Sequence, residues 1–211
     1  VIQAVKTLVG VVKDRCPRCG GSSLDTRPVT MAAMAQRGVH ASTQYKFMVI
    51  CSPSGAYYKE GLAPVKIYVE DTYVRACPGG TGFTKCGGNY AVSLLAGEKA
   101  EKKGDSQVLW LDSQERKYVE EVGAMNIFFK IDGKVYTANA EEQDGTVLPG
   151  VTRRSIIELL RDWGYEVVEG KLAIDTVMAA AQEGKLEEVF GSGTAAVGST
   201  VKQMDYEENT P

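Results

Sequence analysis

The sequence is poor in several residue types and patterns, and each shortage excludes a class of protein. Lysine and arginine (24) nearly balance aspartate and glutamate (27), so the 211-residue chain carries a net charge of only −3. Its basic residues are interspersed with acidic ones, which argues against a nucleic-acid partner. No apolar run approaches the length needed to span a bilayer, and residues 1–15 lack the cleavage site of a signal peptide. We therefore expect a cytoplasmic protein that binds neither nucleic acid nor membrane.

Cysteine and histidine are also too scarce for the usual structural sites. Five cysteines in a chain of this length do not make a disulfide scaffold. Cys16 and Cys19 have the spacing of half a zinc knuckle, but a four-ligand site needs a second pair, which the sequence lacks, and His40 is its only histidine. We therefore predict no metal site. Ordinary free thiols are the leading interpretation, and metal binding or redox pairing of these two cysteines remain alternatives.

The residues that are present suffice for a sizeable core. The chain is 44% hydrophobic, and its length suggests one domain or a little more. It does not begin with methionine, and its first residues already follow a helical pattern, with Ile2, Val5, Val9 and Val12 on one face. We therefore expect that upstream sequence is missing.

Hydrophobic periodicity predicts a mixture of helices and strands. One helix is expected at about 90–103, with Leu94 and Leu95 on its buried side, and another after Gly150, with Trp163 facing the core. Asp132-Gly133 predicts a hairpin turn between two strands. The remaining expected elements are a helix at about 175–183 and strands at 45–50, 65–69 and 108–111. Because strands and helices do not alternate regularly, the predicted fold class is α+β.

The first segment that could carry chemistry is a lysine between glycines, in the sequence Gly79-Gly80-Thr81-Gly82-Phe83-Thr84-Lys85-Cys86-Gly87-Gly88. Glycines on both sides leave little side-chain bulk around Lys85, as a bound planar cofactor would require. The alternative is a solvated lysine in a flexible loop, which the spacing alone favours. A P-loop is excluded, since the Lys-Ser/Thr pair and the four-residue spacer are absent.

Three further segments offer a carboxylate and two anion-binding turns. Glu121 comes just before an apolar strand, although an exposed carboxylate at a strand end is the simpler interpretation. Residues 148–153 open a helix, whose free N–H groups and dipole favour a phosphate, or they simply mark a helix start. Residues 190–196 form a small-residue turn that can offer N–H groups and a hydroxyl to an anion, or an ordinary strand connection.

Together, a reactive lysine, a carboxylate in apolar surroundings and two anion-binding turns are the parts that pyridoxal phosphate requires. At these residues the sequence resembles the branched-chain amino acid aminotransferases. The resemblance runs from about residue 1 to residue 197 and is most specific in the Lys85 loop through Tyr90 and in Glu121-Val122-Gly123. It is also carried by residues 64–71, 108–112, 148–153 and 188–191. It implies the D-amino acid aminotransferase-like fold, a β pseudo-barrel flanked by helices.

The resemblance implies a role for three residues around the cofactor ring. Lys85 would carry pyridoxal 5'-phosphate on its amine and, once released, move the proton between the substrate Cα and the cofactor. Glu121 would pair with the pyridine nitrogen and keep it protonated. Tyr90 would hydrogen-bond the cofactor's 3'-oxygen.

A second set of residues is implied for the phosphate and the substrate. Val151 and Thr152 would offer backbone N–H groups to the phosphate, assisted by Thr194. Thr194 and Ala195 would offer N–H groups to the substrate carboxylate, and Arg27 is also implied in substrate binding. The implied reaction transfers the amino group of leucine, isoleucine or valine to 2-oxoglutarate, without a metal.

The resemblance further implies a domain division and a homodimer. Residues 1–24 would be the end of an interdomain helix with a linker, and residues 25–211 the large cofactor-binding domain, with the smaller N-terminal domain absent. Asp25 stands where the family commonly has tyrosine, and Ala124 where a hydroxyl residue is common. Two alternatives therefore remain: a same-fold aminotransferase or lyase acting on another amino acid, and a non-catalytic cofactor-binding fragment.

Overall fold

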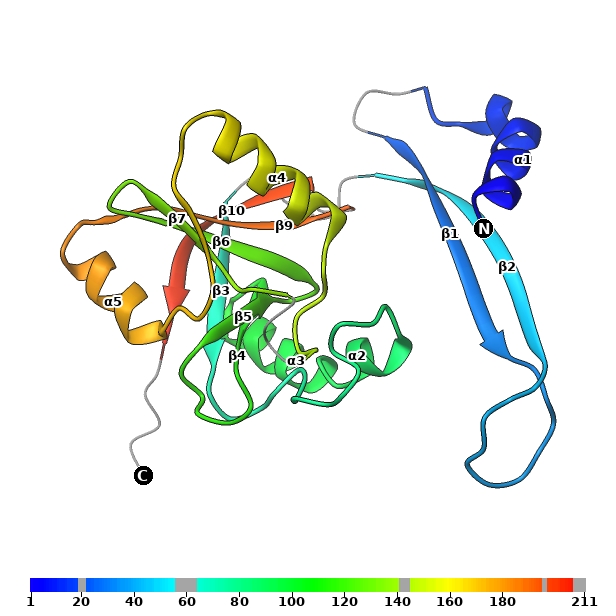
Figure 1. Cartoon of the computed structure of the whole chain (residues 1–211), viewed down its shortest axis with the longest axis horizontal. Coiled ribbons are helices and arrows are strands. Elements are labelled where there is room, and N and C mark those ends of the chain that lie inside the picture. The colour runs from blue at the N-terminus through cyan, green and yellow to red at the C-terminus, as the bar shows by residue number, and fades with distance from the viewer. Residues whose placement is uncertain (19–21, 56–63, 141–144, 195–196, 207–211) are drawn as a thin grey trace. The chain divides into compact units, whose positions relative to one another are not determined.

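The chain forms two compact units, Val1–Lys59 and Glu60–Pro211, in a computed structural model (Figure 1). The structure describes residues 1–18, 22–55, 64–140, 145–194 and 197–206. Within these residues, no helix combines the length and the apolar character needed to cross a membrane.

The first unit is a helix followed by a two-stranded ribbon. It contains α1 (Ile2–Val12), the short 3-10 helix η1 (Lys13–Arg15), β1 (Ser23–Ala32) and β2 (Tyr45–Ser54). The two strands pair antiparallel from Ser23↔Ser54 to Ala32↔Tyr45. The predicted domain division at residue 24 stays a prediction, while the compact units divide at residue 59. The reason is that β1 and β2 pair with each other, and neither joins the large sheet.

The second unit is built on an eight-stranded sheet in the order β5-β4-β3-β10-β9-β6-β7-β8. An additional pairing of β5 with β6 closes six of these strands into a ring, and β7 and β8 extend it. This closed ring with helices around it confirms the predicted α+β pseudo-barrel. The strands are β3 (Val65–Glu70), β4 (Gln107–Leu111), β5 (Val119–Val122), β6 (Met125–Ile131), β7 (Lys134–Thr137), β8 (Val167–Glu169), β9 (Leu186–Gly193) and β10 (Val197–Asp205).

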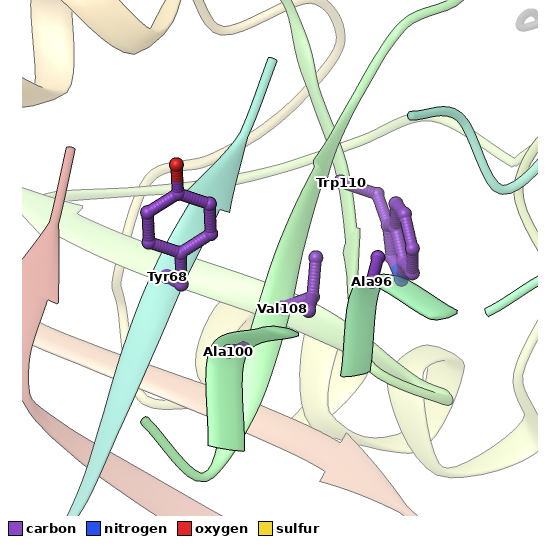
Figure 2. Close-up of a cluster of buried hydrophobic side chains, with 5 residues drawn as sticks. All are labelled: Tyr68, Ala96, Ala100, Val108 and Trp110. Carbon is purple, nitrogen blue, oxygen red and sulfur yellow. The ribbon is translucent and has the colours of Figure 1, made fainter. Parts of the chain in front are cut away.

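The helix α3 covers the sheet beside β3 and β4. Residues 87–103 form α2 (Gly87–Ala91) and α3 (Leu94–Lys103) instead of one continuous helix. Ala96 and Ala100 of α3 pack against Tyr68, Val108 and Trp110 in a buried cluster (Figure 2). The prediction that Leu94 and Leu95 lie on the buried side is wrong, since their exposed fractions are 66% and 52%. The break at Val92–Ser93 resets the helical phase, so the alanines face the sheet.

The other two helices, α4 (Val151–Asp162) and α5 (Ile174–Gln182), lie outside the strands β6 to β9 (Figure 1). On the α4 side, Ile157 packs with Phe128, Val135 and Phe190, and the Phe128 and Phe190 rings stack with centroids 4.9 Å apart. Burying side chains of this size contributes about 1.5–3 kcal/mol each. Trp163, which we expected in the core, follows the end of α4 and is 66% exposed.

Two hairpin turns fix the register of the central strands. Asp132 and Gly133 both have positive φ and join β6 to β7, as the sequence predicts. Gly123 also has positive φ and begins the two-residue turn between β5 and β6. This turn favours glycine because of the positive φ at residue 123, and a Cβ there would also displace the end of the Gln107 side chain.

Candidate functional site

The centre of the candidate site is the carboxylate of Glu121, which is only 3% exposed. Glu121 lies on β5 between Trp110 of β4 and Asn126 of β6. Trp110, from the cluster in Figure 2, donates its indole N–H to the Gly123 carbonyl over 3.1 Å. The core that packs α3 against the sheet thus also holds the turn next to the carboxylate.

Glu121 is held by one cation and two N–H donors. Its Oε2 lies 3.1 Å from Nε of Arg75, a buried ion pair. Its Oε1 accepts a hydrogen bond from the Leu148 backbone N–H at 2.7 Å and a longer one from Asn126 Nδ2 at 3.4 Å. Three partners from separate segments therefore fix one carboxylate, which is more than a strand end requires.

Burial raises the pKa of the Glu121 carboxyl to about 7. The positive charge of Arg75 and the Leu148 N–H act in the opposite direction, and the charge of Lys85 also lowers this pKa. The balance leaves the carboxyl near its titration midpoint at neutral pH. An additional cation beside it would therefore shift the balance to the charged form.

Arg75 joins the carboxylate to the lysine loop. Its Nη2 donates to the Gly82 carbonyl at 3.2 Å and to the Thr146 carbonyl. A Cβ at Gly82 would overlap with the backbone of Thr146, so the loop packs this closely only because residue 82 is glycine. The Phe83 N–H donates to the Gly145 carbonyl at 2.7 Å and adds a second contact between the two segments.

The lysine loop is closed by the amide of Asn89, which is buried. Asn89 Nδ2 donates to the carbonyls of Thr81 and Thr84 at 2.7 and 2.6 Å, and its Oδ1 accepts from the Thr81 hydroxyl at 2.8 Å. Lys85 directly follows this clamp and is exposed, with its Nζ 5.2 Å from the centroid of the Tyr90 ring. The loop is therefore a fixed support for a lysine whose amine remains accessible.

The start of α4 lies on the other side of Glu121. No side chain caps this helix, so the N–H groups of Val151 and Thr152 in its first turn are available to an anion. Gly150 precedes the helix with extended backbone and contacts Asn126, since a Cβ there would overlap with Asn126 Oδ1. Asn126 thus touches both the carboxylate and the helix entrance.

Two hydroxyl residues lie at the end of β9 and just after it. Ser192 pairs directly with Asn126 across the sheet, and its hydroxyl is buried without a hydrogen-bond partner among the described residues. Thr194 follows the end of β9 and is exposed. A buried hydroxyl without a partner is suited to a polar ligand.

A pocket connects several of these groups. Its lining includes Arg75, Glu121 and Leu148, together with Thr84 and Tyr90 from the two sides of Lys85. The structure therefore brings Glu121 and the lysine loop to one pocket, and it places the α4 N-terminus next to Leu148.

Not every residue in the sequence prediction belongs to this arrangement. Arg27 lies on β1 in the other unit, where its Nη2 pairs with Asp25 Oδ2 at 3.3 Å. Ala195 and Cys19 lie outside the described residues. The roles of the predicted site residues stay predictions.

Sequence reasoning missed three residues that organise the site: Arg75, Asn89 and Asn126. Each is buried although its side chain is polar or charged. Asn89 lies within the Lys85 loop through Tyr90, and the only available signal for the three residues was an arginine or an amide next to apolar or glycine-rich sequence. That signal does not identify the partner, because the partners of Arg75 and Asn126 come from distant parts of the chain.

Comparison with protein families gives one match over nearly the whole chain. The model of the family described as amino-transferase class IV matches residues 7–204. A relative from Bacillus subtilis (strain 168), branched-chain-amino-acid aminotransferase 2, is 52% identical over 210 residues, covering 100% of this chain and 57% of its own length. The chain thus spans a little over half the length of the curated relatives that it matches.

Solved structures agree with this match. The branched-chain amino acid aminotransferase of Escherichia coli is 32% identical with a TM-score of 0.73, covering 87% of this chain and 58% of that one. The T.th. branched-chain amino acid aminotransferase, solved with pyridoxamine 5'-phosphate, is 29% identical with a TM-score of 0.77. That match covers 96% of this chain and 61% of the other.

Proposed function

Because the chain belongs to the class IV aminotransferase family, we propose that it is the cofactor-bearing part of a branched-chain amino acid aminotransferase. The proposed reaction transfers the amino group of leucine, isoleucine or valine to 2-oxoglutarate, with pyridoxal 5'-phosphate as the cofactor. In this proposal residues 25–211 are the cofactor-binding domain, and Lys85, Glu121 and α4 lie in its compact unit 60–211.

The residues present fit this cofactor at each of its reactive ends. A protonated pyridine nitrogen needs an anion, and Glu121 is a buried carboxylate in the pocket. A phosphate needs N–H donors, and the uncapped start of α4 offers those of Val151 and Thr152. An aldehyde needs an amine, and Lys85 stands exposed at the end of a rigid loop. Tyr90, on the pocket wall, would donate to the 3'-oxygen.

When bound, pyridoxal phosphate supplies an electron sink for the pair left on the substrate Cα. Lys85 would first hold the cofactor and then act as the base that moves the substrate Cα proton to the cofactor's C4′ carbon. Glu121 would hold a proton on the ring nitrogen. Its own pKa, raised to about 7 by burial, falls when a cation pairs with it, so the carboxylate and the protonated ring stabilise each other.

Substrate binding would involve the turn after β9 and the first unit. Thr194 and Ala195 would offer backbone N–H groups to the substrate carboxylate, and Thr194 would also assist at the phosphate. Arg27 is proposed to contribute from the first unit. A homodimer in the cytoplasm completes the proposal, and light scattering on the purified protein tests the dimer.

The single observation that carries the proposal is the buried Glu121 carboxylate, held by Arg75 and Leu148 within one pocket. A buried carboxylate with a raised pKa inside a pocket is characteristic of functional sites. The deciding experiment incubates the protein with pyridoxal phosphate, reduces it with borohydride and locates the adduct by peptide mass spectrometry. We expect the adduct on Lys85, and none in Lys85→Ala. Adducts spread over surface lysines would overturn the proposal.

One observation favours a second candidate, a same-fold enzyme acting on another amino acid. Arg27 pairs with Asp25, the residue that replaces the tyrosine common in the family, so its guanidinium is engaged within its own strand. A transamination assay that compares leucine with D-alanine and L-glutamate distinguishes the two. Bound cofactor without turnover of any of these would instead support a binding-only fragment.

A further inference from the structure

We propose that Asn126 is a positioning residue that holds the Glu121 carboxylate in register with the N-terminus of α4. The two ends of the cofactor, its ring nitrogen and its phosphate, would then be recognised as one unit. The inference rests on the proposed function, because it assigns Asn126 a role toward the cofactor proposed there.

Asn126, Glu121 and Leu148 form a closed ring of hydrogen bonds. Asn126 Nδ2 donates to Glu121 Oε1 at 3.4 Å and to the Leu148 carbonyl at 2.9 Å. The Leu148 N–H donates to the same Glu121 oxygen at 2.7 Å. The backbone of Leu148 is therefore linked to the carboxylate twice. Its N–H bonds Glu121 directly, and its carbonyl is linked to Glu121 through Asn126.

The chain path from this ring to α4 is short. Leu148 is followed by Pro149 and Gly150, and α4 begins at Val151. Proline restricts the backbone of this segment. Gly150 contacts Asn126 Oδ1 so closely that any Cβ would overlap with it. The amide therefore touches this segment at Leu148 and again at Gly150, so the helix entrance cannot shift without moving the carboxylate's donors.

Few side chains other than asparagine could link the Glu121 carboxylate to the start of α4. Asn126 is 5% exposed and lies directly opposite Glu121 across the β5–β6 hairpin. An aspartate there could not donate and would place a second negative charge beside the first. A serine offers one donor, whereas an amide offers two and remains neutral. The site therefore requires an amide at this position.

The test is a double-mutant cycle on cofactor affinity in the full chain. The variants are Asn126→Leu, which keeps a similar volume and removes both donors, Glu121→Ala, which removes the acceptor, and the double variant. If Asn126 acts through Glu121, Asn126→Leu weakens pyridoxal phosphate binding about tenfold beside Glu121 and less than about twofold in the Glu121→Ala background. Equal losses in both backgrounds would overturn the inference.

A second readout separates positioning from general loss of stability. The pH at which the bound cofactor changes its absorbance should move in Asn126→Leu, because the carboxylate beside the ring is displaced. It should not move in the control Thr137→Val, which removes another buried hydrogen bond of β6, from Thr137 Oγ1 to the Ile127 carbonyl at 2.7 Å. An unchanged midpoint in Asn126→Leu would also overturn the inference.

The outcomes distinguish this inference from the proposed function. If the unmodified chain forms no Lys85 adduct with pyridoxal phosphate, the proposed function fails and the role of Asn126 fails with it. If the adduct forms and the cycle is additive, only the role of Asn126 fails. Should Asn126→Leu not fold, Asn126→Ser replaces it, with a smaller loss expected because one donor is kept.

Discussion

Glu121 is a buried acid whose surroundings only partly compensate for the loss of water. In the folded chain burial raises its pKa from 4.5 to about 7, against the charge of Arg75. Below pH 4.5 the Glu121 carboxyl is protonated in both the folded and the unfolded chain. The folded chain then has its full stability with respect to this group, because no buried charge has to form. As the pH rises through 7, the folded chain must ionise a buried group, and this contribution to stability is lost.

We therefore predict that the cofactor-free protein loses stability between pH 5 and pH 8, and that Glu121→Gln removes part of this loss. The pKa difference corresponds to on the order of 3 kcal/mol. The measurement is the free energy of unfolding in denaturant at both pH values. Because other acids also titrate, the decisive quantity is the difference in pH dependence between the unmodified protein and Glu121→Gln. An identical pH dependence in Glu121→Gln would contradict the assigned pKa.

Asp105 is a second buried acid, and it lies outside the candidate site. It is 3% exposed, and neither carboxylate oxygen has a hydrogen-bond partner among the described residues. Burial and the nearby charge of Asp205 raise its pKa. We predict that Asp105→Asn stabilises the protein by about 1 kcal/mol at pH 8, because it removes a charge that the fold does not satisfy.

The advantage of Asp105→Asn should shrink as the pH falls, because protonation neutralises the wild-type carboxyl as well. Chemical denaturation at pH 8 and pH 5 measures both effects. The exposed Asp162 gives a matched control, since Asp162→Asn removes a solvated charge at the end of α4. A loss of stability in Asp105→Asn at pH 8 would show that the carboxylate has a favourable partner.

At the scale of the elements, the start of α4 depends on a residue without a side chain. Gly150 has φ −64° and ψ 133°, which any residue can adopt, so glycine is required there by its contact with Asn126 Oδ1 and not by its conformation. We predict that Gly150→Ala costs about 1–3 kcal/mol of stability and weakens pyridoxal phosphate binding, because the added methyl displaces Asn126 or the helix entrance.

Gly170 provides the control for that prediction. A Cβ there meets no atom within 4 Å, and its φ lies outside the positive range. Gly170→Ala should therefore leave both stability and binding within error. Thermal unfolding measures the stability of the two variants, and titration with pyridoxal phosphate measures their binding. Equal behaviour of Gly150→Ala and Gly170→Ala would show that the helix entrance tolerates movement.

The elements also show which features a sequence can predict. The Asp132-Gly133 hairpin and the start of α4 follow from local turn chemistry, and both are confirmed. The buried face of α3 was wrong, because a helix break two residues earlier changed the phase and small alanines took the place expected for leucines. Local patterns state where an element starts and ends more reliably than which face is buried.

Across the whole second unit, the closed ring of strands was expected only from the family resemblance. Its closure depends on the β5–β6 hairpin and on β10 lying beside β3, segments from opposite ends of the unit. The same limitation applies to the site. Motifs identified Lys85 and Glu121, but the ion pair between Arg75 and Glu121 joins a loop residue to a strand that periodicity does not relate to it.

The two units differ sharply in how much they bury. Among the described residues of Val1–Lys59, none is buried, whereas all the largest fully buried side chains, such as Trp110 and Phe128, belong to Glu60–Pro211. Because stability depends on buried apolar area, the first unit should add little to the free energy of unfolding. A two-stranded ribbon without a buried face is not stable on its own.

We therefore predict that a chain starting at residue 60 unfolds within about 4 °C of the full chain, which for a unit of this size corresponds to roughly 1 kcal/mol. Calorimetry of both chains without cofactor measures this. The shorter chain should still give the Lys85 adduct with pyridoxal phosphate, since the residues proposed to hold the cofactor lie after residue 60. It should lose amino-acid turnover if Arg27 contributes to substrate binding. A large drop in the unfolding temperature would contradict this prediction, because the first unit would then add substantially to the stability of the full chain.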